Sequence, residues 1–558
     1  MIIDASLQGR IKELMYDFVR IYTPTGTAGE RGAESFYSGL FASMDYFRER
    51  PGLAGMYEIP GDFLGRSVHW CLVKGKGDDT AVFLHHYDVV DTDDYRNVQG
   101  LATEPDALAE ALREGRISID DGAKRDLESG KWIFGRGVAD MKGGAAVQMA
   151  LLERYAEAAG KGELQGNILM VGVPDEENIS AGGRAAPLLL KKLKDEHGLR
   201  YVLAMNAEPN ERVDDNGRLG LFIGSIGKVM PLIYVRGKLS HAGLLYEGLN
   251  SIKVLSKIVG VLDVDPELID GIDGIVSPAP TFLYMKDTKT VYDVSLPAAA
   301  SAYMNVMFFR KSIGEIMEIV RRRCVAGFEA AIADVQRSFD AFNAASGNMA
   351  RALPWKANVK LYSQIREEAL RDSGEAFEKA MAALTANIKD KVAAGEMTMV
   401  DASHAIIEHT LLYVRDVSPV AVIALIPPYY PVVRNAMLGD TAEAAEVDRL
   451  CDEVIGRAKS KFGKEHVRHH IIGMSDLSYF MKNPAPGDNA YVSSNMLLWE
   501  DIYSIPFGAV DEISMPVMNI GPLGRDIHEY TERVLEEDLL RRTPDLMAFA
   551  IEKILKIV

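Results

Sequence analysis

The stretch from Asn167 to Asn178 reads Asn-Ile-Leu-Met-Val-Gly-Val-Pro-Asp-Glu-Glu-Asn, and the rest of the chain is organised around it. Its apolar run, Ile168 to Val173, is short, partly β-branched and stopped by Pro174, a pattern typical of a buried β-strand. Three acids, Asp175 to Glu177, follow directly. Acids side by side after a buried strand are unfavourable unless a cation neutralises them. A solvated surface loop is the alternative interpretation of a lone acidic triplet.

The same arrangement recurs along the chain, which favours a site over a surface loop. Several apolar segments are each followed by His, Asp or Glu just beyond their C-terminal ends. In an open α/β sheet these ends form the edge where ligands bind. The segments are Ala81 to Leu84, followed by His85, His86 and Asp88; Tyr201 to Met205, followed by Glu208; and Met515 to Ile520, followed by Asp526 and His528.

The bulk composition of the 558 residues excludes several classes of protein. A hydrophobic content of 48% is ample for sizeable cores and for more than one domain. A formal net charge of -18 argues against a nucleic-acid partner, whose phosphates require a surplus of Lys and Arg. The three cysteines, Cys71, Cys324 and Cys451, fit a reducing compartment without a disulfide framework. Because no cysteine pair has zinc-finger spacing, a metal must be held by His and carboxylates.

Neither a secretory leader nor a membrane span is expected. The N-terminus, Met1 to Ser6, shows no basic segment followed by a long apolar stretch. The chain contains no run of about twenty apolar residues, the length that crosses a bilayer. We therefore expect a cytoplasmic protein with no membrane partner.

Periodic patterns predict an α/β domain with a second domain inserted into it. The chain is expected to be helical over about Ser6 to Phe47, with a turn at Thr23 to Thr27 after which the helix resumes at Glu30. Ser67 to Val73 is expected to be a strand in which His69 is structural. The charged stretch Val90 to Gly130 is interpreted as a surface excursion. From Gly224 the predicted order is strand, helix, strand, strand, helix, which suggests an open-faced sandwich. The later predicted elements are strands Val229–Arg236, Thr281–Met285, Tyr303–Phe309 and Val420–Ile426, and helices Asn250–Val264, Ser312–Ala345, Gln364–Ala394, Asp440–Phe462 and Thr531–Ile557.

These patterns divide the chain into three parts. Residues 1–226 are expected to form the first part of a catalytic domain, and residues 418–558 its second part. Residues 227–417 are expected to form an inserted lid and dimerisation domain.

Two local motifs carry further candidate ligands. On an extended backbone His86 and Asp88 face the same way, so one can bind a metal while the other orients it. His85 competes for the ligand role, but its side chain would point to the opposite face. Asp140 lies between the glycine-rich stretch that begins at Trp132 and the start of a helix. In that position it could hold a metal or simply cap the helix.

The candidate ligands are suited to a pair of metal ions. Two zinc ions would each need about four N and O donors and an open place for water. A shared carboxylate, best Asp140, would hold them about 3.5–4 Å apart, where they lower the pKa of a bridging water and polarise a carbonyl oxygen. Of Glu176 and Glu177, one can be a ligand while its neighbour takes up a proton and passes it on. The proposed donors are His86, Asp140, Glu177, Glu208 and His528.

Six motifs in order along nearly the whole chain resemble those of a known family. They are His86-x-Asp88-Val-Val, Gly137-Val-Ala-Asp140-Met-Lys-Gly-Gly144, Asp175-Glu-Glu177, Asn206-Ala-Glu208-Pro209, Ser240-His-Ala-Gly243 and Gly521-Pro-Leu-Gly-x-x-x-His528. The family is metallopeptidase family twenty, the aminoacylase and carboxypeptidase G group of zinc-dependent exopeptidases and deacylases. The resemblance implies an α/β fold: a zinc-exopeptidase-like catalytic domain with a central mixed sheet and flanking helices, plus an inserted α+β, ferredoxin-like lid domain.

The resemblance also implies a role for each candidate residue. One zinc would be held by His86, Asp140 and Glu208, and the other by Asp140, Glu177 and His528. Glu176 would be the general base, Asp88 would support His86, and His241 in the lid would stabilise the oxyanion. The implied cofactors are two Zn2+ ions, with Mn2+ or Co2+ as substitutes. The implied substrate is a small peptide or N-substituted amino acid, and the expected assembly is a homodimer, in which His241 acts in its own chain or across the dimer.

Within the family, the chain length, Pro427 to Pro431 and Gly473 to Asp476 look most like the RocB-type arginine-utilisation branch. Asn178 departs from the Val or Ile and then Gly that often follow the glutamates, and Lys228 to Asp416 is longer than a usual lid. These departures concern the substrate and the oligomeric state rather than the metal chemistry. One alternative is a ureido or amidine hydrolase acting on an arginine-related amino acid. Another is a non-catalytic binding relative, which is disfavoured because every ligand and base position is filled.

Overall fold

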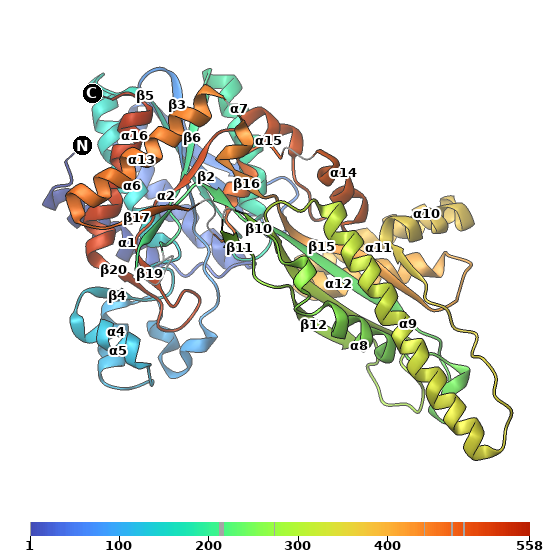
Figure 1. Cartoon of the computed structure of the whole chain (residues 1–558). Helices are drawn as coiled ribbons and strands as arrows, with labels where there is room; N and C mark the ends of the chain where they lie inside the picture. Colours follow the sequence, from blue (N-terminus) through green and yellow to red (C-terminus); the bar gives the residue numbers. More distant parts are fainter. Residues whose placement is uncertain are drawn as a thin grey trace. The chain divides into compact units, whose positions relative to one another are not determined.

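The computed structural model describes residues 2–210, 217–272, 274–439, 441–469, 473–483 and 486–557. The chain divides into two compact units, shown in Figure 1 with colours that follow the sequence. Unit 1 consists of Met1–Ile226, Pro431–Pro484 and Ile505–Val558. Unit 2 consists of Gly227–Tyr430 and Ala485–Ser504.

Unit 1 is built on an eight-stranded mixed sheet with the order β1-β2-β5-β3-β6-β18-β7-β17. The predicted buried strand forms β5 (Gln165–Val173), which pairs in parallel with β3 (Lys76–His86). β3 also pairs in parallel with β6 (Arg200–Asn206), and β6 pairs in parallel with β18 (Val517–Asn519). These four strands therefore end at one edge of the sheet, which brings the residues after them together. The other strands are β1 (Ala54–Glu58), β2 (Ser67–Lys74), β7 (Leu219–Phe222) and β17 (His466–His469).

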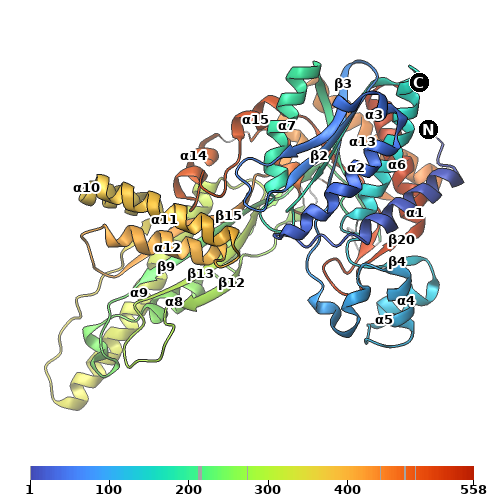
Figure 2. The same ribbon diagram turned by 180° about the vertical axis from the view of Figure 1, so that it is seen from behind.

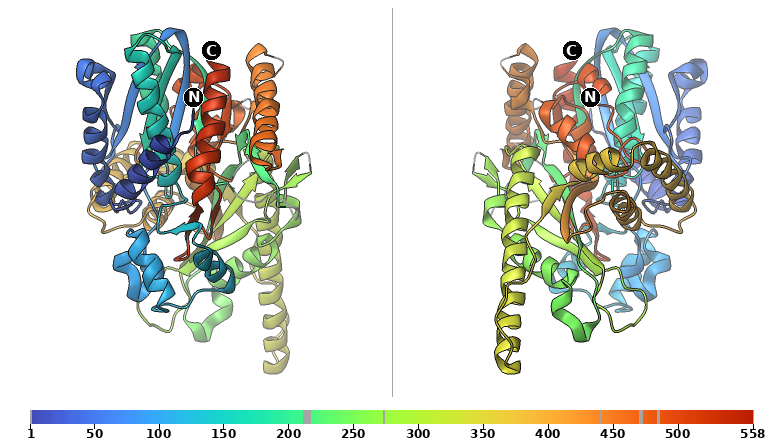
Figure 3. Two further views of the ribbon diagram at one scale, coloured as in Figure 1. Left: turned by 90° about the vertical axis from the view of Figure 1, so that its left-hand side faces the viewer. Right: turned by 90° about the vertical axis from the view of Figure 1, so that its right-hand side faces the viewer.

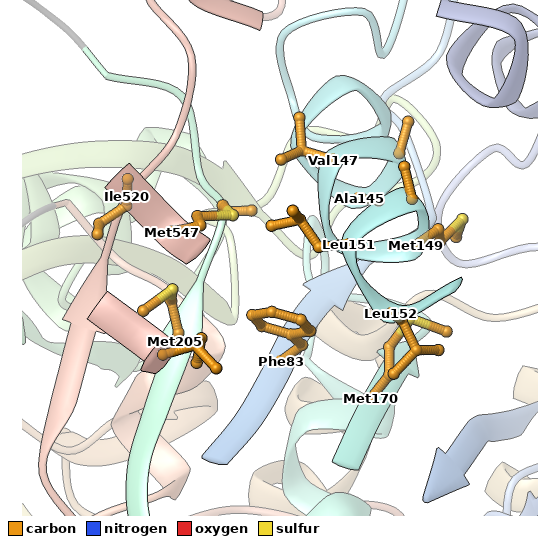
Figure 4. Packing of buried hydrophobic residues seen from close by; sticks show 14 of the residues in the cluster. Phe83, Ala145, Val147, Met149, Leu151, Leu152, Met170, Met205, Ile520 and Met547 are labelled. Atoms are coloured by element: carbon orange, nitrogen blue, oxygen red, sulfur yellow. The ribbon is translucent and has the colours of Figure 1, made fainter. Parts of the chain in front are cut away.

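Helices cover the sheet because side chains alternate between its two faces along each strand. On one face Phe83 of β3 and Met170 of β5 join Met149 and Leu152 of α6 (Lys142–Gly160) in the main apolar cluster (Figure 4). The first half of α6 is apolar or small nearly all round, which suits a helix buried on every side. Other helices of this cluster are α1 (Ala5–Val19), α2 (Ala33–Ser43), α3 (Asp45–Glu49), α13 (Ala442–Phe462) and α16 (Thr543–Ile554).

Two more helices of unit 1 contribute no residue to that cluster. α7 (Ala181–His197) packs against β2 and β5, and α15 (Phe507–Ile513) packs on α7. α7 begins directly after the acidic loop that follows β5, so its first turn lies close to the candidate glutamates.

The charged stretch predicted as a surface excursion has a small apolar core of its own. It contains the 3-10 segment η3 (Asp93–Leu101) and the helices α4 (Pro105–Arg113) and α5 (Asp121–Ser129). Their apolar residues form a separate cluster that includes Phe134. Phe134 belongs to β4 (Trp132–Phe134), one strand of a three-stranded sheet with β20 (Arg533–Leu535) and β19 (Gly524–Arg525).

Unit 2 begins with the predicted order of elements, but further helices pack on its sheet, so it is not an open-faced sandwich. Its five-stranded sheet has the order β12-β13-β9-β15-β14. The chain passes through β9 (Gly227–Arg236), α8 (Ser251–Leu262), β12 (Thr281–Asp287), β13 (Ala299–Phe308) and the long helix α9 (Ile313–Ser346), which Figure 3 shows from two further sides.

Further helices of unit 2 are shown in Figure 2. Their buried apolar residues form a second cluster with residues of β9 and β15. The single helix predicted over residues 364–394 is two helices separated by Gly374, whose φ of 52° ends the first of them. The helices of this cluster are α10 (Tyr362–Ser373), α11 (Glu375–Ala393) and α12 (Met399–Leu412). Unit 2 also contains β14 (Val359–Leu361) and α14 (Pro486–Asn495).

The structure differs from the predicted domain boundary at 417/418. The sequence predicts that Val420–Ile426 returns the chain to the catalytic domain, but this segment lies in β15 (Val420–Tyr430). β15 pairs antiparallel with β9, so it belongs to unit 2. An apolar strand has a clear local pattern, but the pattern does not specify which of two sheets it joins.

Two predicted helices also start later than expected. In place of one helix from Thr531, the chain forms β20, a π-helical turn η8 (Asp538–Arg542) and then α16. Pairing of β20 with β4 overrides the helical tendency of this segment. Asp440, the predicted start of another helix, lies outside the described residues, and α13 follows the N-cap Thr441. Among the described residues, no helix has both the length and the apolar character needed to cross a bilayer.

Candidate metal centre

The edge of the unit 1 sheet brings three ligand-type side chains into one cluster. His86 is the last residue of β3, Glu177 lies in the loop after β5, and Asp140 lies just before α6. One ligand atom from each lies within 4.8 Å of the others. The structure therefore places together three of the residues that the sequence predicts as metal ligands.

Asp140 lies between two histidines and faces each with a different oxygen. Its Oδ1 is 3.0 Å from Nε2 of His86, and its Oδ2 is 3.2 Å from Nε2 of His528. Oε1 of Glu208 is 3.7 Å from Nε2 of His86, whereas Oε1 of Glu177 is 2.8 Å from Nε2 of His528. The five predicted ligands thus form two groups that share Asp140, the arrangement expected of a carboxylate that bridges two metal ions.

The electrostatics of this cluster favour positive charge. Burial alone would lower the pKa of His86, but Glu208, Asp140 and Asp88 raise it well above its usual value. Hydrogen bonds with Asp140 and Glu177 raise the pKa of His528 to about 10. Burial opposes the ionisation of Asp140, yet the two histidines hold its pKa below its usual value. Protons on the imidazoles thus balance the carboxylates, and divalent cations can take their place while the imidazoles become neutral ligands.

The two adjacent glutamates have different surroundings. Burial raises the pKa of Glu176 well above its usual value, and Glu208 and Glu177 act in the same direction. Burial also raises the pKa of Glu177, but the hydrogen bond with His528 opposes this, and the pKa is raised to about 7. Neighbouring carboxyls in different surroundings are suited to separate tasks, one binding a cation and one carrying a proton.

Asp88 supports both His86 and the loop that carries the glutamates. Its Oδ1 and Oδ2 accept hydrogen bonds from the backbone N–H groups of Glu176 and Glu177, each at 3.1 Å. Its Oδ1 is 3.5 Å from Nδ1 of His86, and its backbone carbonyl oxygen is 3.1 Å from the same nitrogen. The position two residues after His86 therefore serves two elements, of which the sequence predicts only the first.

His85 and His69 have structural surroundings, as the sequence predicts. Nε2 of His85 is 2.8 Å from the hydroxyl of Tyr37, and its Nδ1 is 2.8 Å from Oε1 of Gln148. His69 is fully buried and stacks on Tyr37, with ring centroids 4.4 Å apart. The side chain of His85 faces away from that of His86 because adjacent residues of a strand face opposite sides.

A buried pair, Arg136 and Glu532, connects the segments that carry Asp140 and His528. Glu532 accepts hydrogen bonds from the backbone N–H groups of Ala139 at 3.1 Å and Asp140 at 3.2 Å, and from Nη1 of Arg136 at 2.9 Å. Arg136 also donates to the backbone carbonyl of His528 at 3.3 Å. Sequence reasoning misses this pair because its members are 396 residues apart. The sequence near each residue indicates only that Arg136 lies in the glycine-rich loop and that Glu532 follows His528 by four residues.

Asp476, quoted above only as part of a branch motif, is also buried in unit 1. Burial raises its pKa to about 7. A Cβ on Gly183, in the first turn of α7, would lie 1.9 Å from Oδ1 of Asp476, so the carboxyl occupies the space that this glycine leaves. The residues directly before this motif, His470 to Ile472, lie outside the described residues.

His241 belongs to unit 2, whereas the other seven predicted site residues belong to unit 1. It is exposed and is the N-cap of the 3-10 segment η4 (Ala242–Glu247). Its Nδ1 accepts a hydrogen bond from the N–H of Gly243 at 3.1 Å. This contact orients the imidazole ring. The catalytic role of His241 stays a prediction.

The sequence profile of Peptidase family M20/M25/M40 matches residues 83–493. The chain belongs to this family. This M20 protein is 30% identical to the uncharacterized protein YqjN of Bacillus subtilis over 549 residues, which cover 97% of the chain and 96% of YqjN. It is 26% identical to protein RocB of the same organism over 539 residues, which cover 94% of the chain and 91% of RocB.

A solved structure shows the same fold. The M20 family metallo-carboxypeptidase Sso-CP2 from Sulfolobus solfataricus superposes with a TM-score of 0.51 at 13% identity, covering 98% of this chain and 99% of that one. The predicted family and the predicted fold, a catalytic domain with a central mixed sheet and an inserted lid domain, are confirmed. Membership in this metallopeptidase family makes the M20 protein a hydrolase, as predicted.

Proposed function

We propose that this protein is a two-metal hydrolase that cleaves an amide or peptide bond of a small amino-acid-derived substrate. The observation that carries the proposal is Asp140, whose two oxygens face His86 and His528 separately. N and O donors of this kind suit two Zn2+ ions, with Mn2+ or Co2+ as substitutes. When bound, such a pair polarises the scissile carbonyl and lowers the pKa of the attacking water.

Glu176 is the proposed general base. Its carboxyl accepts the proton of the attacking water and delivers it to the leaving nitrogen. A buried carboxyl with a raised pKa is suited to hold this proton between the two steps. Glu177, which contacts His528, is assigned to the metals instead. Asp88 orients His86 and holds the backbone of both glutamates.

The two glutamates provide the test. Glu176→Gln is expected to bind metal normally but to lose about 10²–10⁴-fold in kcat, the usual contribution of a general base. Glu177→Gln is expected to bind less metal. Metal content and turnover are measured on both variants, with the exposed Glu163→Gln of the same unit as a control that changes neither. Loss of metal in Glu176→Gln together with full metal content in Glu177→Gln would show that the two roles are reversed.

We further propose that the substrate is an arginine-related amino acid derivative. Similarity to RocB extends over nearly the whole chain, and the branch motifs of the sequence point the same way. A ureido or amidine hydrolase is the second candidate for the same site. A screen of N-acyl amino acids, dipeptides and citrulline-like compounds, with zinc- or manganese-loaded protein, separates these classes. Absence of cleavage of every class by fully metal-loaded protein would overturn the proposal.

A homodimer and a cytoplasmic location complete the proposal. β12 lies at the edge of the unit 2 sheet, and Leu283 and Met285 on it are 55% and 45% exposed. An edge strand with exposed apolar side chains favours pairing with another chain, and a second copy is the commonest partner. The location is supported by three free, buried cysteines, Cys71, Cys324 and Cys451, which form no disulfide among the described residues.

His241 is the proposed donor to the oxygen that becomes negative during attack. Removing such a donor reduces kcat by about 10²–10³-fold. Mixing the inactive variants His241→Ala and Glu176→Gln tests whether it acts across the dimer. Activity returns if a mixed dimer assembles one complete site. A mixture that stays inactive while subunits exchange shows that His241 serves its own chain or has no catalytic role.

A further inference from the structure

The loop that carries the two glutamates has a backbone conformation that the surrounding structure must hold in place. Asp175, at its start, has a φ of 72°, and Ser180, at its end, has a φ of 51°. Residues other than glycine persist in this left-handed region only where their neighbours impose it. Contacts at both ends of the loop therefore decide where Glu176 and Glu177 lie.

Asp175 makes several of these contacts. Its side chain is fully buried. Its Oδ2 accepts a hydrogen bond from the N–H of Ala181 at 3.1 Å, and its Oδ1 accepts one from the side-chain amide of Asn178 at 3.3 Å. Its backbone carbonyl accepts from the N–H of Ser180 at 2.6 Å. One residue thus closes the loop by bonding to its middle and its far end.

Arg66 connects Asp175 to the rest of unit 1. Its Nη1 donates to Oδ1 of Asp175 at 2.6 Å and to Oε1 of Glu30 at 2.7 Å, and its Nη2 donates to Oδ1 of Asp62 at 2.7 Å. All four side chains are at most 4% exposed. The planar guanidinium can hold several carboxylates at once, which an ammonium group cannot do with the same geometry. Arg66 precedes β2, so it ties the loop to a strand that contributes no predicted ligand.

We propose that Arg66, acting through Asp175, is a positioning residue for Glu176. The inference rests on the proposed role of Glu176 as general base. Asp88 holds the N–H groups of Glu176 and Glu177 from the end of β3, and Arg66 holds the residue before them from the start of β2. With two anchors on different strands, the carboxyl of Glu176 keeps one position relative to the metal ligands.

The proposal predicts a loss of turnover that persists when the metal sites are saturated with zinc and substrate binding is unchanged. A displacement of about 1 Å of a catalytic group can reduce the rate about 10²-fold. Arg66→Lys keeps the charge but loses the fork that reaches Asp175, and Asp175→Asn weakens the same contact from the loop. Each is expected to lower kcat about 10- to 100-fold at saturating zinc, with KM at the wild-type value.

Arg31→Lys is the matched control. Arg31 is exposed and pairs with Glu34. The same substitution, arginine to lysine, is thus made in the same unit away from the anchor formed by Arg66 and Asp175. Wild-type kcat is expected for Arg31→Lys.

The experiment measures kcat, KM and bound zinc per folded molecule for the wild type, these three variants and Glu176→Gln. A selective loss of kcat in Arg66→Lys and Asp175→Asn supports the proposal. If Glu176→Gln is inactive but both variants keep wild-type kcat, the inference is wrong and the proposed function stands. If both lose activity only in proportion to the folded fraction, the role is structural and the inference is also wrong. If Glu176→Gln keeps wild-type kcat, the proposed base is wrong and the inference falls with it.

Discussion

Replacing Glu532 with alanine tests whether the buried pair with Arg136 holds the metal centre together. Glu532 is 1% exposed and Arg136 is 2% exposed. The substitution removes the acceptor of three hydrogen bonds, from the N–H groups of Ala139 and Asp140 and from the guanidinium. The buried positive charge then keeps one carboxylate contact, with Asp94 at 3.1 Å, which is partly exposed to solvent.

The contacts allow the size of the effect to be worked out. Removing one partner of a buried ion pair typically costs about 3–5 kcal/mol of the free energy of unfolding. Because Asp94 compensates part of the charge of Arg136, we expect the lower end, about 3 kcal/mol. The residue also fixes the backbone of Asp140 and, through Arg136, that of His528. Loss of such support behind metal ligands typically weakens metal affinity about 10- to 100-fold.

Two measurements check these values. Urea unfolding of the metal-free protein gives the change in the free energy of unfolding, and a zinc titration against a competing chelator gives the change in affinity. Glu529→Ala, an exposed acid three residues away, is the control and is expected to change neither quantity. The reasoning is refuted if Glu532→Ala unfolds within about 1 kcal/mol of the wild type and binds zinc with unchanged affinity.

Three further outcomes are expected. Burial lowers the pKa of His69 from 6.5 to about 3, so between these values the unfolded chain binds more protons than the folded one, and stability present above pH 6.5 is lost as the pH falls. Below pH 6.5, the free energy of unfolding should therefore fall less steeply with pH in His69→Phe, by up to about 1.4 kcal/mol per pH unit. Urea unfolding at several pH values measures this dependence, and an unchanged dependence would contradict the prediction. A Cβ on Gly144 would lie 2.2 Å from the carbonyl oxygen of Ala207, so Gly144→Ala should destabilise unit 1 by about 1–3 kcal/mol, whereas Gly160→Ala, with no atom within 4 Å, should not; equal effects in thermal unfolding would refute the steric argument. Zinc at about 100 times its Kd should stabilise the wild type by about 2.7 kcal/mol and a ligand variant, Glu177→Gln, by clearly less, and identical shifts in Tm would exclude Glu177 as a ligand.

Much of the candidate site can be predicted from the sequence because its signals are local. The strand before the glutamates is specified within a dozen residues, by an apolar run and a proline, and it forms β5 as predicted. The ligand types are equally local, since His, Asp and Glu at the ends of parallel strands must meet at one sheet edge. Alternation along a strand also separates His86 from His85. The order of elements in unit 2 follows from the same kind of patterning.

Other features were decided only by the tertiary structure. The sequence marks Val420–Ile426 as a strand, but its partner is β9 of unit 2, and no local pattern specifies that choice. The sequence lists the ligands, but only the fold sets one oxygen of Asp140 against His86 and the other against His528. The supporting contacts, such as that between Arg66 and Asp175, join residues far apart in the chain. Burial, pairing and pKa shifts arise from these long-range contacts, and periodicity within a short window carries no information about them.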